Sequence, residues 1–104
     1  NPAIQIVGCQ PTPESSIPWI RRWPEAYLPK IFDPNRGDCV NDISQQEATE
    51  LARELVKREG VFAGMSTGGA FAGALKIASE IEEGVIVFIA CDRGDRYLSS
   101  DLFG

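Results

Sequence analysis

The sequence contains no histidine among its 104 residues, and this absence excludes several kinds of active site. A serine nucleophile of the Ser-His-Asp type needs an imidazole as its base, so a hydrolase of that type is excluded. Zinc sites are built mainly from histidine and clustered cysteine, and we therefore expect no metal site. The pattern G-x-x-x-x-G-K-[ST] is also missing, which excludes a P-loop nucleotide-binding protein.

Cysteines and long apolar runs are scarce as well. The three cysteines, Cys9, Cys39 and Cys91, are an odd number without C-x-x-C spacing, which indicates a reducing cytoplasm. No run approaches the roughly 18 apolar residues of a membrane span, and no secretory signal is present, so we expect no membrane partner. The net charge of −5 would repel phosphates, and nucleic acid is not an expected partner.

What the chain does contain is typical of a globular domain with one modest core. Hydrophobic residues make up 43% of the chain and charged residues 24%, which is ordinary for such a domain. Helices are predicted over residues 44–59 and 68–82, and strands over residues 4–10, 39–43, 61–63 and 85–90. The alternation of strands and helices predicts an α/β fold with a mainly parallel sheet.

Local signals support two of these elements. Ser44 followed by Glu47 fits a capping box at the start of the first helix, and Gly60 is a natural stop at its end. The run 85–90 is apolar at every position, which is typical of a strand covered on both faces in a parallel sheet.

The stretch 63–70, Ala-Gly-Met-Ser-Thr-Gly-Gly-Ala, predicts a strand, a tight turn and a helix. Ser66 or Thr67 is the expected N-cap of that helix. The free N–H groups of the first turn could bind an anionic ligand, and Gly68 and Gly69 would let the backbone approach it closely. The simpler alternative, which the pattern alone favours, is a capped helix start with small residues for close packing.

Segments at the carboxyl ends of predicted strands are the other candidates for a site. Residues 9–16 lie at the end of the first predicted strand and residues 91–96 follow the last, and ligands bind at such ends in open α/β sheets. We therefore hypothesise that both converge with the Ser66 turn on one pocket. Asp92 and Asp95 could bind a metal, but pairing with the neighbouring arginines is the favoured alternative.

The segments 60–70 and 91–99 together closely resemble the C-terminal third of cysteine synthases of the B type (O-acetylserine sulfhydrylases). These are fold-type-II pyridoxal-phosphate-dependent enzymes. Val-Gly-Cys-Gln-Pro at 7–11 and Ile-Arg-Arg-Trp-Pro at 20–24 match as well, so the resemblance covers nearly the whole chain. It implies part of a three-layer sandwich, with residues 1–104 forming the C-terminal portion of the large cofactor-binding domain.

The resemblance implies a β-replacement reaction in amino-acid biosynthesis. Such a transferase makes L-cysteine or S-sulfocysteine from O-acetylserine and sulfide or thiosulfate, uses pyridoxal 5'-phosphate, and acts as a cytoplasmic homodimer. The family's Schiff-base lysine, substrate-carboxylate loop and phosphate loop lie upstream of Asn1. The resemblance therefore implies no catalytic residue in this segment, which would need the rest of the enzyme chain as its partner.

The resemblance also assigns residues to the cofactor. Ser66 matches the family serine that hydrogen-bonds the pyridine nitrogen, and Cys91 matches the position that packs beside the same edge of the ring. Gly64 and Asp92 complete the implied cofactor-binding set. A neutral hydroxyl holds a pyridinium less firmly than a carboxylate does, which should favour elimination over transamination.

A loop over residues 11–37 is predicted from its many prolines, and the resemblance makes it the active-site covering loop. Within it, Arg21, Arg22 and Trp23 match the family's mobile substrate loop, where two cations could guide an anionic nucleophile. Surface solubility is the alternative explanation for the arginines. Two other functions stay open: a non-catalytic module that binds a small anion or pyridoxal phosphate at the Ser66 turn, and a related lyase such as a dehydratase or cystathionine β-synthase.

Overall fold

The computed structural model describes residues 1–18 and 20–103; Trp19, in the predicted covering loop, lies outside them. The described residues combine a parallel sheet with α-helices, as the sequence predicts for an α/β protein, but both strands precede both α-helices along the chain. The elements in order are β1 (Val7–Pro11), the 3₁₀ turns η1 (Glu25–Tyr27) and η2 (Pro34–Arg36), β2 (Cys39–Ile43), α1 (Gln45–Glu54), the π-helical turn η3 (Leu55–Glu59), α2 (Met65–Ala78) and the 3₁₀ turn η4 (Gly94–Tyr97).

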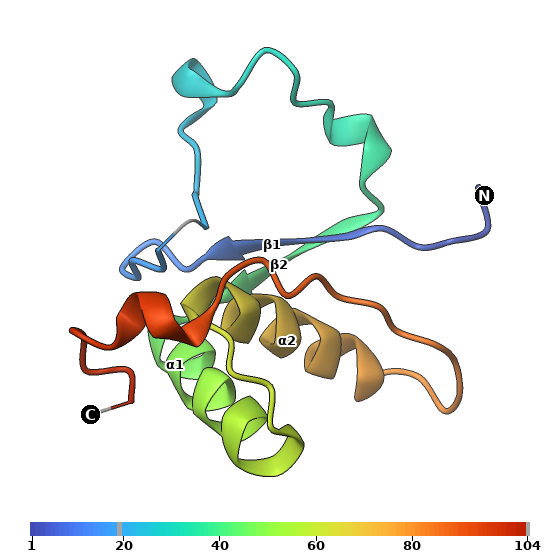
Figure 1. Cartoon of the computed structure of the whole chain (residues 1–104). Coiled ribbons are helices and arrows are strands. Elements are labelled where there is room, and N and C mark those ends of the chain that lie inside the picture. The colour runs from blue at the N-terminus through green and yellow to red at the C-terminus, as the bar shows by residue number, and fades with distance from the viewer. Residues whose placement is uncertain (19, 104) are drawn as a thin grey trace.

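The two strands form a parallel sheet in which Val7 pairs with Cys39 and Pro11 with Ile43. Both predicted strands are confirmed, although β1 begins three residues later than expected and includes Pro11. The connection between the strands begins close to the sheet, where Ile17 lies in the core. Its later part, which carries η1 and η2, arches away from the sheet on the side opposite to α1 and α2 (Figure 1). Because the strands are parallel, their carboxyl ends meet at one edge, where the predicted covering loop starts.

Helix α1 begins with the predicted capping box. Ser44 Oγ accepts a hydrogen bond from the Glu47 N–H at 3.1 Å, and Glu47 Oε2 accepts one from the Ser44 N–H at 2.8 Å. The hydrogen bond from the Ser44 backbone also lowers the pKa of the Glu47 carboxyl. After α1 the chain continues through η3 and ends at Gly60, whose φ of 68° is the left-handed conformation that glycine adopts readily. The predicted helix boundaries are therefore confirmed.

Replacing Ser44 by alanine should weaken the first turn of α1, because one N–H group would lose its acceptor. Losses of this kind cost about 1 kcal/mol, which corresponds to roughly fivefold faster hydrogen exchange at the Glu47 amide. Ser99→Ala, at an exposed position outside the helices, is the matched control. Equal exchange at Glu47 in both variants would contradict a stabilising cap.

Small residues allow the two helices to approach closely. Ala48 and Ala52 of α1 are fully buried, and Gly68 of α2 faces them. A Cβ atom at position 68 would lie 2.0 Å from the Ala48 carbonyl oxygen. The core around this contact is modest, and its buried members are Ile17, Ile43, Ala48, Ala52, Met65, Ala72, Tyr97 and Leu102.

The prediction of a strand over residues 85–90 is wrong, and the one over 61–63 is reduced to a single bridge between Ala63 and Arg93. Residues 85–90 form no regular strand, and Val85 is 92% exposed and Ile89 74% exposed. A strand needs a neighbouring backbone to pair with, and the sheet of the described residues contains only β1 and β2. The apolar pattern alone could not reveal that missing neighbour.

Helix α2 is confirmed but starts three residues earlier than predicted and ends at Ala78 instead of residue 82. It lies beside α1 beneath the sheet (Figure 1). Among the described residues, no helix has both the length and the apolar character that a membrane span requires. All three cysteines lie in the described part of the chain, and each is a free thiol.

Candidate active site

The start of α2 and the segment 91–97 are brought together, although they lie 25 or more residues apart in the sequence. Ala63 and Arg93 form an antiparallel bridge, and the Gly94 N–H donates to the Phe62 carbonyl at 3.0 Å. The Gly64 N–H donates to the Asp92 carbonyl at 3.4 Å. Two of the three predicted site segments therefore lie against each other.

The carboxylate of Asp92 caps α2. Its Oδ1 accepts from the Thr67 N–H at 3.0 Å and the Gly64 N–H at 3.1 Å, while Oδ2 accepts from the Ser66 N–H at 3.1 Å. The prediction of Ser66 or Thr67 as N-cap is wrong, because both residues lie in the first turn and Gly64 holds the N-cap position. The Asp92 carboxylate accepts hydrogen bonds from several N–H groups, and it replaces the weaker cap that a local hydroxyl would provide.

Two hydroxyl groups hold this carboxylate from its other sides. Thr67 Oγ1 donates to Oδ1 and the Tyr97 hydroxyl donates to Oδ2, both over 2.6 Å. Gly64 makes room for the arrangement, since a Cβ atom there would lie 2.1 Å from Tyr97 Cε2 and 2.4 Å from Asp92 Oδ2. The implied cofactor residues Gly64 and Asp92 thus build the turn that carries Ser66.

These hydrogen bonds set the protonation of Asp92. Burial raises the pKa of its carboxyl, but hydrogen bonds from Thr67, Tyr97 and the Ser66 backbone outweigh burial, so the pKa lies below its usual range. Asp92 is therefore ionised at neutral pH. Among the residues that the structure describes, no arginine pairs with Asp92. The predicted pairing is found at Asp95 instead, whose Oδ2 lies 3.0 Å from Arg93.

Acid should loosen the start of α2. An aspartate in an unfolded chain has a pKa of about 4, so Asp92 stabilises the fold above that pH. This stabilisation is lost as the pH falls through the lowered pKa of the folded state. We expect the protection of the Ser66 and Thr67 amides, corrected for the intrinsic exchange rate, to fall below pH 4. Asp92→Asn should show low protection at every pH, and a pH-dependent loss in that variant would assign the effect to another group.

Ser66 and Cys91 form the contact at the centre of the candidate site. The Cys91 thiol donates a weak hydrogen bond to Ser66 Oγ over 3.3 Å. Because Ser66 Oγ is the acceptor in this contact, its own O–H can donate a hydrogen bond to an acceptor on a ligand. Ser66 is only 2% exposed, whereas Cys91 is exposed, so the pair reaches the surface on the Cys91 side.

The capped turn is not an anion site. The N–H groups of Ser66 and Thr67 already donate to the Asp92 carboxylate. They are therefore not free to bind the anionic ligand that the sequence predicts as one alternative. A phosphate would meet an ionised carboxylate at this helix end. This geometry argues against a module that binds a small anion at the Ser66 turn.

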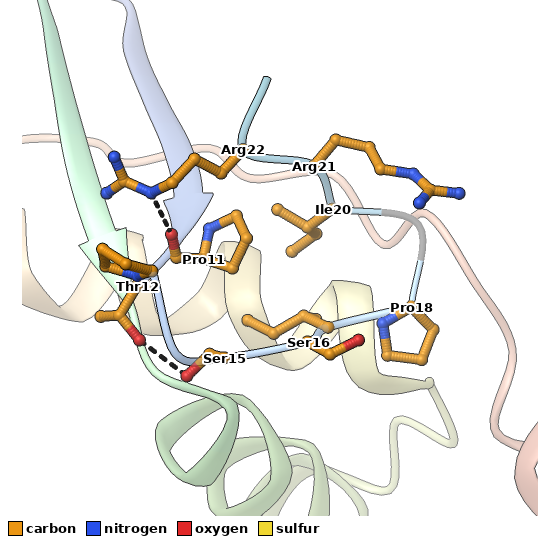
Figure 2. A pocket seen from close by; sticks show the side chains of 10 residues that line it. Pro11, Thr12, Ser15, Ser16, Pro18, Ile20, Arg21 and Arg22 are labelled. Carbon is orange, nitrogen blue, oxygen red and sulfur yellow. Dashed lines mark hydrogen bonds between the residues drawn. The ribbon is translucent and has the colours of Figure 1, made fainter. Parts of the chain in front are cut away.

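The third predicted segment lines a cavity of about 320 Å³ at the carboxyl end of β1. Arg22 and Arg21 both line it, but their guanidinium groups extend in opposite directions (Figure 2). Arg22 donates to the Pro11 carbonyl at 2.9 Å and forms an ion pair with Asp42 at 2.7 Å. Arg22 therefore fastens the loop to the sheet, while Arg21 is exposed.

The cavity lies close to α2. Ile20, which lines the cavity, contacts Gly69, where a Cβ atom would lie 2.6 Å from Ile20 Cδ1. Gly69 follows Ser66 by less than one helical turn. Trp23, the last of the predicted loop residues, is about half exposed and does not line the cavity.

Sequence reasoning gave no role to Tyr97 and considered Thr67 only as a possible N-cap. Both hold the Asp92 carboxylate, and both are buried. Their hydroxyl groups are the only signal in the sequence, since neither spacing nor pattern links residue 67 to residues 92 and 97.

Known proteins match this chain over most of its length. The family model described as "Pyridoxal-phosphate dependent enzyme" matches residues 1–92. The cysteine synthase B of Pseudomonas aeruginosa is 55% identical over 103 residues, which are 99% of this chain and 34% of that protein. The cysteine synthase B of Escherichia coli is 55% identical over 101 residues, 97% of this chain and 33% of that protein.

Solved structures match as well. A cysteine synthase from Entamoeba histolytica matches with a TM-score of 0.85 and 32% sequence identity. The match covers 96% of this chain and 32% of the Entamoeba chain. O-ureido-L-serine synthase matches with a TM-score of 0.86 and 28% sequence identity. This match covers 99% of this chain and 35% of the synthase chain. The chain thus spans about a third of the length of the curated relatives and solved structures described above.

Proposed function

This chain belongs to the family of pyridoxal-phosphate-dependent enzymes, and we propose that it acts as the C-terminal third of a cysteine synthase of the B type. The predicted resemblance to B-type cysteine synthases and the predicted fold class are both confirmed by the relatives and structures above. The observation that carries the proposal is the 55% identity over 99% of the chain, which includes the whole capped turn.

The proposed reaction is a β-replacement. O-acetylserine loses acetate, and sulfide or thiosulfate takes its place, which yields L-cysteine or S-sulfocysteine. The lysine and the loops that bind the substrate carboxylate and the cofactor phosphate belong to the other two thirds of such an enzyme. This segment contributes the cofactor-facing turn and the covering loop over residues 11–37.

The residues present fit one end of pyridoxal phosphate. When bound, this cofactor supplies an electron sink for the amino acid. The Ser66 hydroxyl can donate a hydrogen bond to the ring nitrogen. Cys91 Sγ lies 3.3 Å from Ser66 Oγ and so would lie beside the same end of the ring. The phosphate group belongs elsewhere, because Asp92 occupies the N–H groups of α2. Gly64 and Asp92 support the ring-binding turn.

In the covering loop we assign the guidance of the anionic nucleophile to Arg21. Arg22 is neutralised by Asp42, whereas Arg21 keeps an exposed charge beside the cavity. Trp23 stands next to this pair in the chain and belongs to the same proposed substrate loop.

Arg21→Ala should raise the KM for thiosulfate by about fivefold at low salt, with a smaller effect near 0.5 M salt, because screening removes steering between separated charges. Arg36→Ala, an exposed arginine in the same loop, is the control and should leave this KM unchanged. Equal KM values for the two variants at low salt would contradict a steering role for Arg21.

The proposal is tested with a chimaera in which these 104 residues replace the matched third of the Pseudomonas aeruginosa cysteine synthase B. We expect a pyridoxyl-phosphate adduct in the intact-mass spectrum after borohydride reduction, and L-cysteine from O-acetylserine and sulfide. With thiosulfate, S-sulfocysteine should form. A cofactor-loaded chimaera that releases a 2-oxo acid from serine but makes no cysteine would favour a dehydratase instead.

The surroundings of such an enzyme are part of the proposal. We place it in the cytoplasm, in cysteine biosynthesis, as a homodimer with small-molecule substrates. Sedimentation of the chimaera would test the dimer, and a monomer with full activity would refute it.

A further inference from the structure

We propose that Asp92 is a positioning residue of this reaction: its carboxylate ties the first turn of α2 to the segment 91–97 and so holds the Ser66 hydroxyl beside Cys91. The inference rests on the proposed function, because Ser66 is the residue that faces the cofactor ring. Asp92 itself acts through Ser66.

Ser66 is held at two points by two consecutive residues. Its N–H donates to Asp92 Oδ2 at 3.1 Å, and its Oγ accepts from the Cys91 thiol at 3.3 Å. Because Cys91 and Asp92 are covalent neighbours, the position of one restricts the other. The hydrogen bond from the Ser66 N–H to the Asp92 carboxylate thus determines where the Ser66 hydroxyl lies relative to Cys91.

The carboxylate has little freedom of its own. Thr67 and Tyr97, both buried, donate hydroxyl groups to it over 2.6 Å, and the Thr67 N–H adds a bond at 3.0 Å. Charge-assisted hydrogen bonds of this kind are among the stronger ones in proteins. A side chain fixed from several directions can hold its partner to within a fraction of an ångström, which is what a cofactor-facing group requires.

The charge of Asp92 has a second effect on Ser66. The N-terminus of a helix carries a partial positive charge, and the carboxylate lies against it. Without the carboxylate, the Ser66 hydroxyl would sit in an unopposed positive potential, which changes how strongly it donates to the ring nitrogen. The electronic state of the cofactor should therefore respond to Asp92 through Ser66, even though no contact between Asp92 and the cofactor is needed.

The test compares Asp92→Asn, Ser66→Ala and the double variant in the full-length chimaera. Asn keeps the size of the side chain but removes the charge. In the cofactor-free protein we expect the Ser66 and Thr67 amides to exchange about tenfold faster in Asp92→Asn. In the loaded protein we expect about tenfold lower kcat, less than a twofold change in KM for O-acetylserine, and a shifted visible absorbance of the cofactor.

In the Ser66→Ala background, Asp92→Asn should lower kcat by less than twofold, because the residue through which it acts is gone. Asp95→Asn, an exposed carboxylate paired with Arg93, is the matched control and should match the wild type. Tyr97→Phe removes one bond to the carboxylate and should reproduce the same changes at smaller size, which keeps the test usable if Asp92→Asn does not fold.

The outcomes separate the two proposals. A wild-type chimaera without cofactor absorbance or cysteine formation would overturn the proposed function, and the positioning role with it. A loaded, active chimaera in which the Asp92→Asn and Ser66→Ala effects multiply would overturn the positioning role alone. Unchanged amide exchange in Asp92→Asn would also overturn it.

Discussion

Replacing Gly68 by alanine should separate α1 from α2 and remove a large part of the stability of this domain. The added Cβ would lie 2.0 Å from the Ala48 carbonyl oxygen and 3.0 Å from Ala52 Cβ. The first of these atoms belongs to the backbone of α1, so no side-chain rotation can relieve the clash. The helices must move apart, and the fully buried Ala48 and Ala52 would lose their packing.

The steric cost exceeds the gain from better helix propensity. Overpacking a core costs about 1–3 kcal/mol when side chains can adjust, and we expect at least about 3 kcal/mol here because a backbone carbonyl is the obstacle. Alanine in a helix gains only about 1 kcal/mol over glycine. The net loss is a sizeable fraction of the roughly 5–15 kcal/mol that stabilises a typical domain.

Gly37→Ala is the matched control, since a Cβ atom there meets nothing within 4 Å and its φ of −101° suits any residue. Thermal unfolding of the chimaera should show a clearly lower midpoint for Gly68→Ala and an unchanged one for Gly37→Ala. Equal midpoints would mean that α1 and α2 are less closely packed than the structure shows.

How far the sequence predicts this molecule depends on where the partners of each residue lie. The start of α1 was predictable because Ser44 and Glu47 are three residues apart and satisfy each other. The start of α2 was not, because its cap, Asp92, lies far along the chain. No local pattern distinguishes a helix capped by its own serine from one capped by a distant carboxylate.

The same distinction explains the strand that did not form. Residues 85–90 have the composition of a buried strand, and the pattern identified their apolar character correctly. A strand also needs a paired neighbour, and the described residues supply none beside this segment. Arg22 shows the same effect in the site: its ion pair with Asp42 is a tertiary contact that its place in the loop could not predict.

The residue pattern alone does not predict that Ser66 contacts a cofactor; only the family resemblance does. From its pattern alone, Ser66 was best explained as part of a capped helix start, which is close to what the structure shows. Its assignment to the cofactor rests on the family. The structure adds the reason why this turn needs Gly64, since Asp92 and Tyr97 occupy the space of a side chain there.

A carboxylate at position 66 should abolish the activity of the full-length chimaera. Ser66 is buried, and its N–H already donates to Asp92 Oδ2 at 3.1 Å. Ser66→Asp would therefore place two carboxylates at one helix end, where like charges and burial both oppose ionisation. A carboxylate facing the ring would also hold a proton on its nitrogen, which the neutral hydroxyl does not. We expect kcat/KM to fall by at least about 10³-fold, equivalent to about 4 kcal/mol.

Ser66→Asn separates charge from size, because its side chain matches aspartate but is neutral. We expect its kcat/KM to exceed that of Ser66→Asp by about 100-fold at pH 7, or roughly 3 kcal/mol of transition-state stabilisation. Lowering the pH should raise the activity of Ser66→Asp relative to Ser66→Asn, since one proton bound between the two carboxylates removes the repulsion. If the two variants are equally inactive at every pH, size and not charge limits position 66. The neutral hydroxyl would then be required only because it is small.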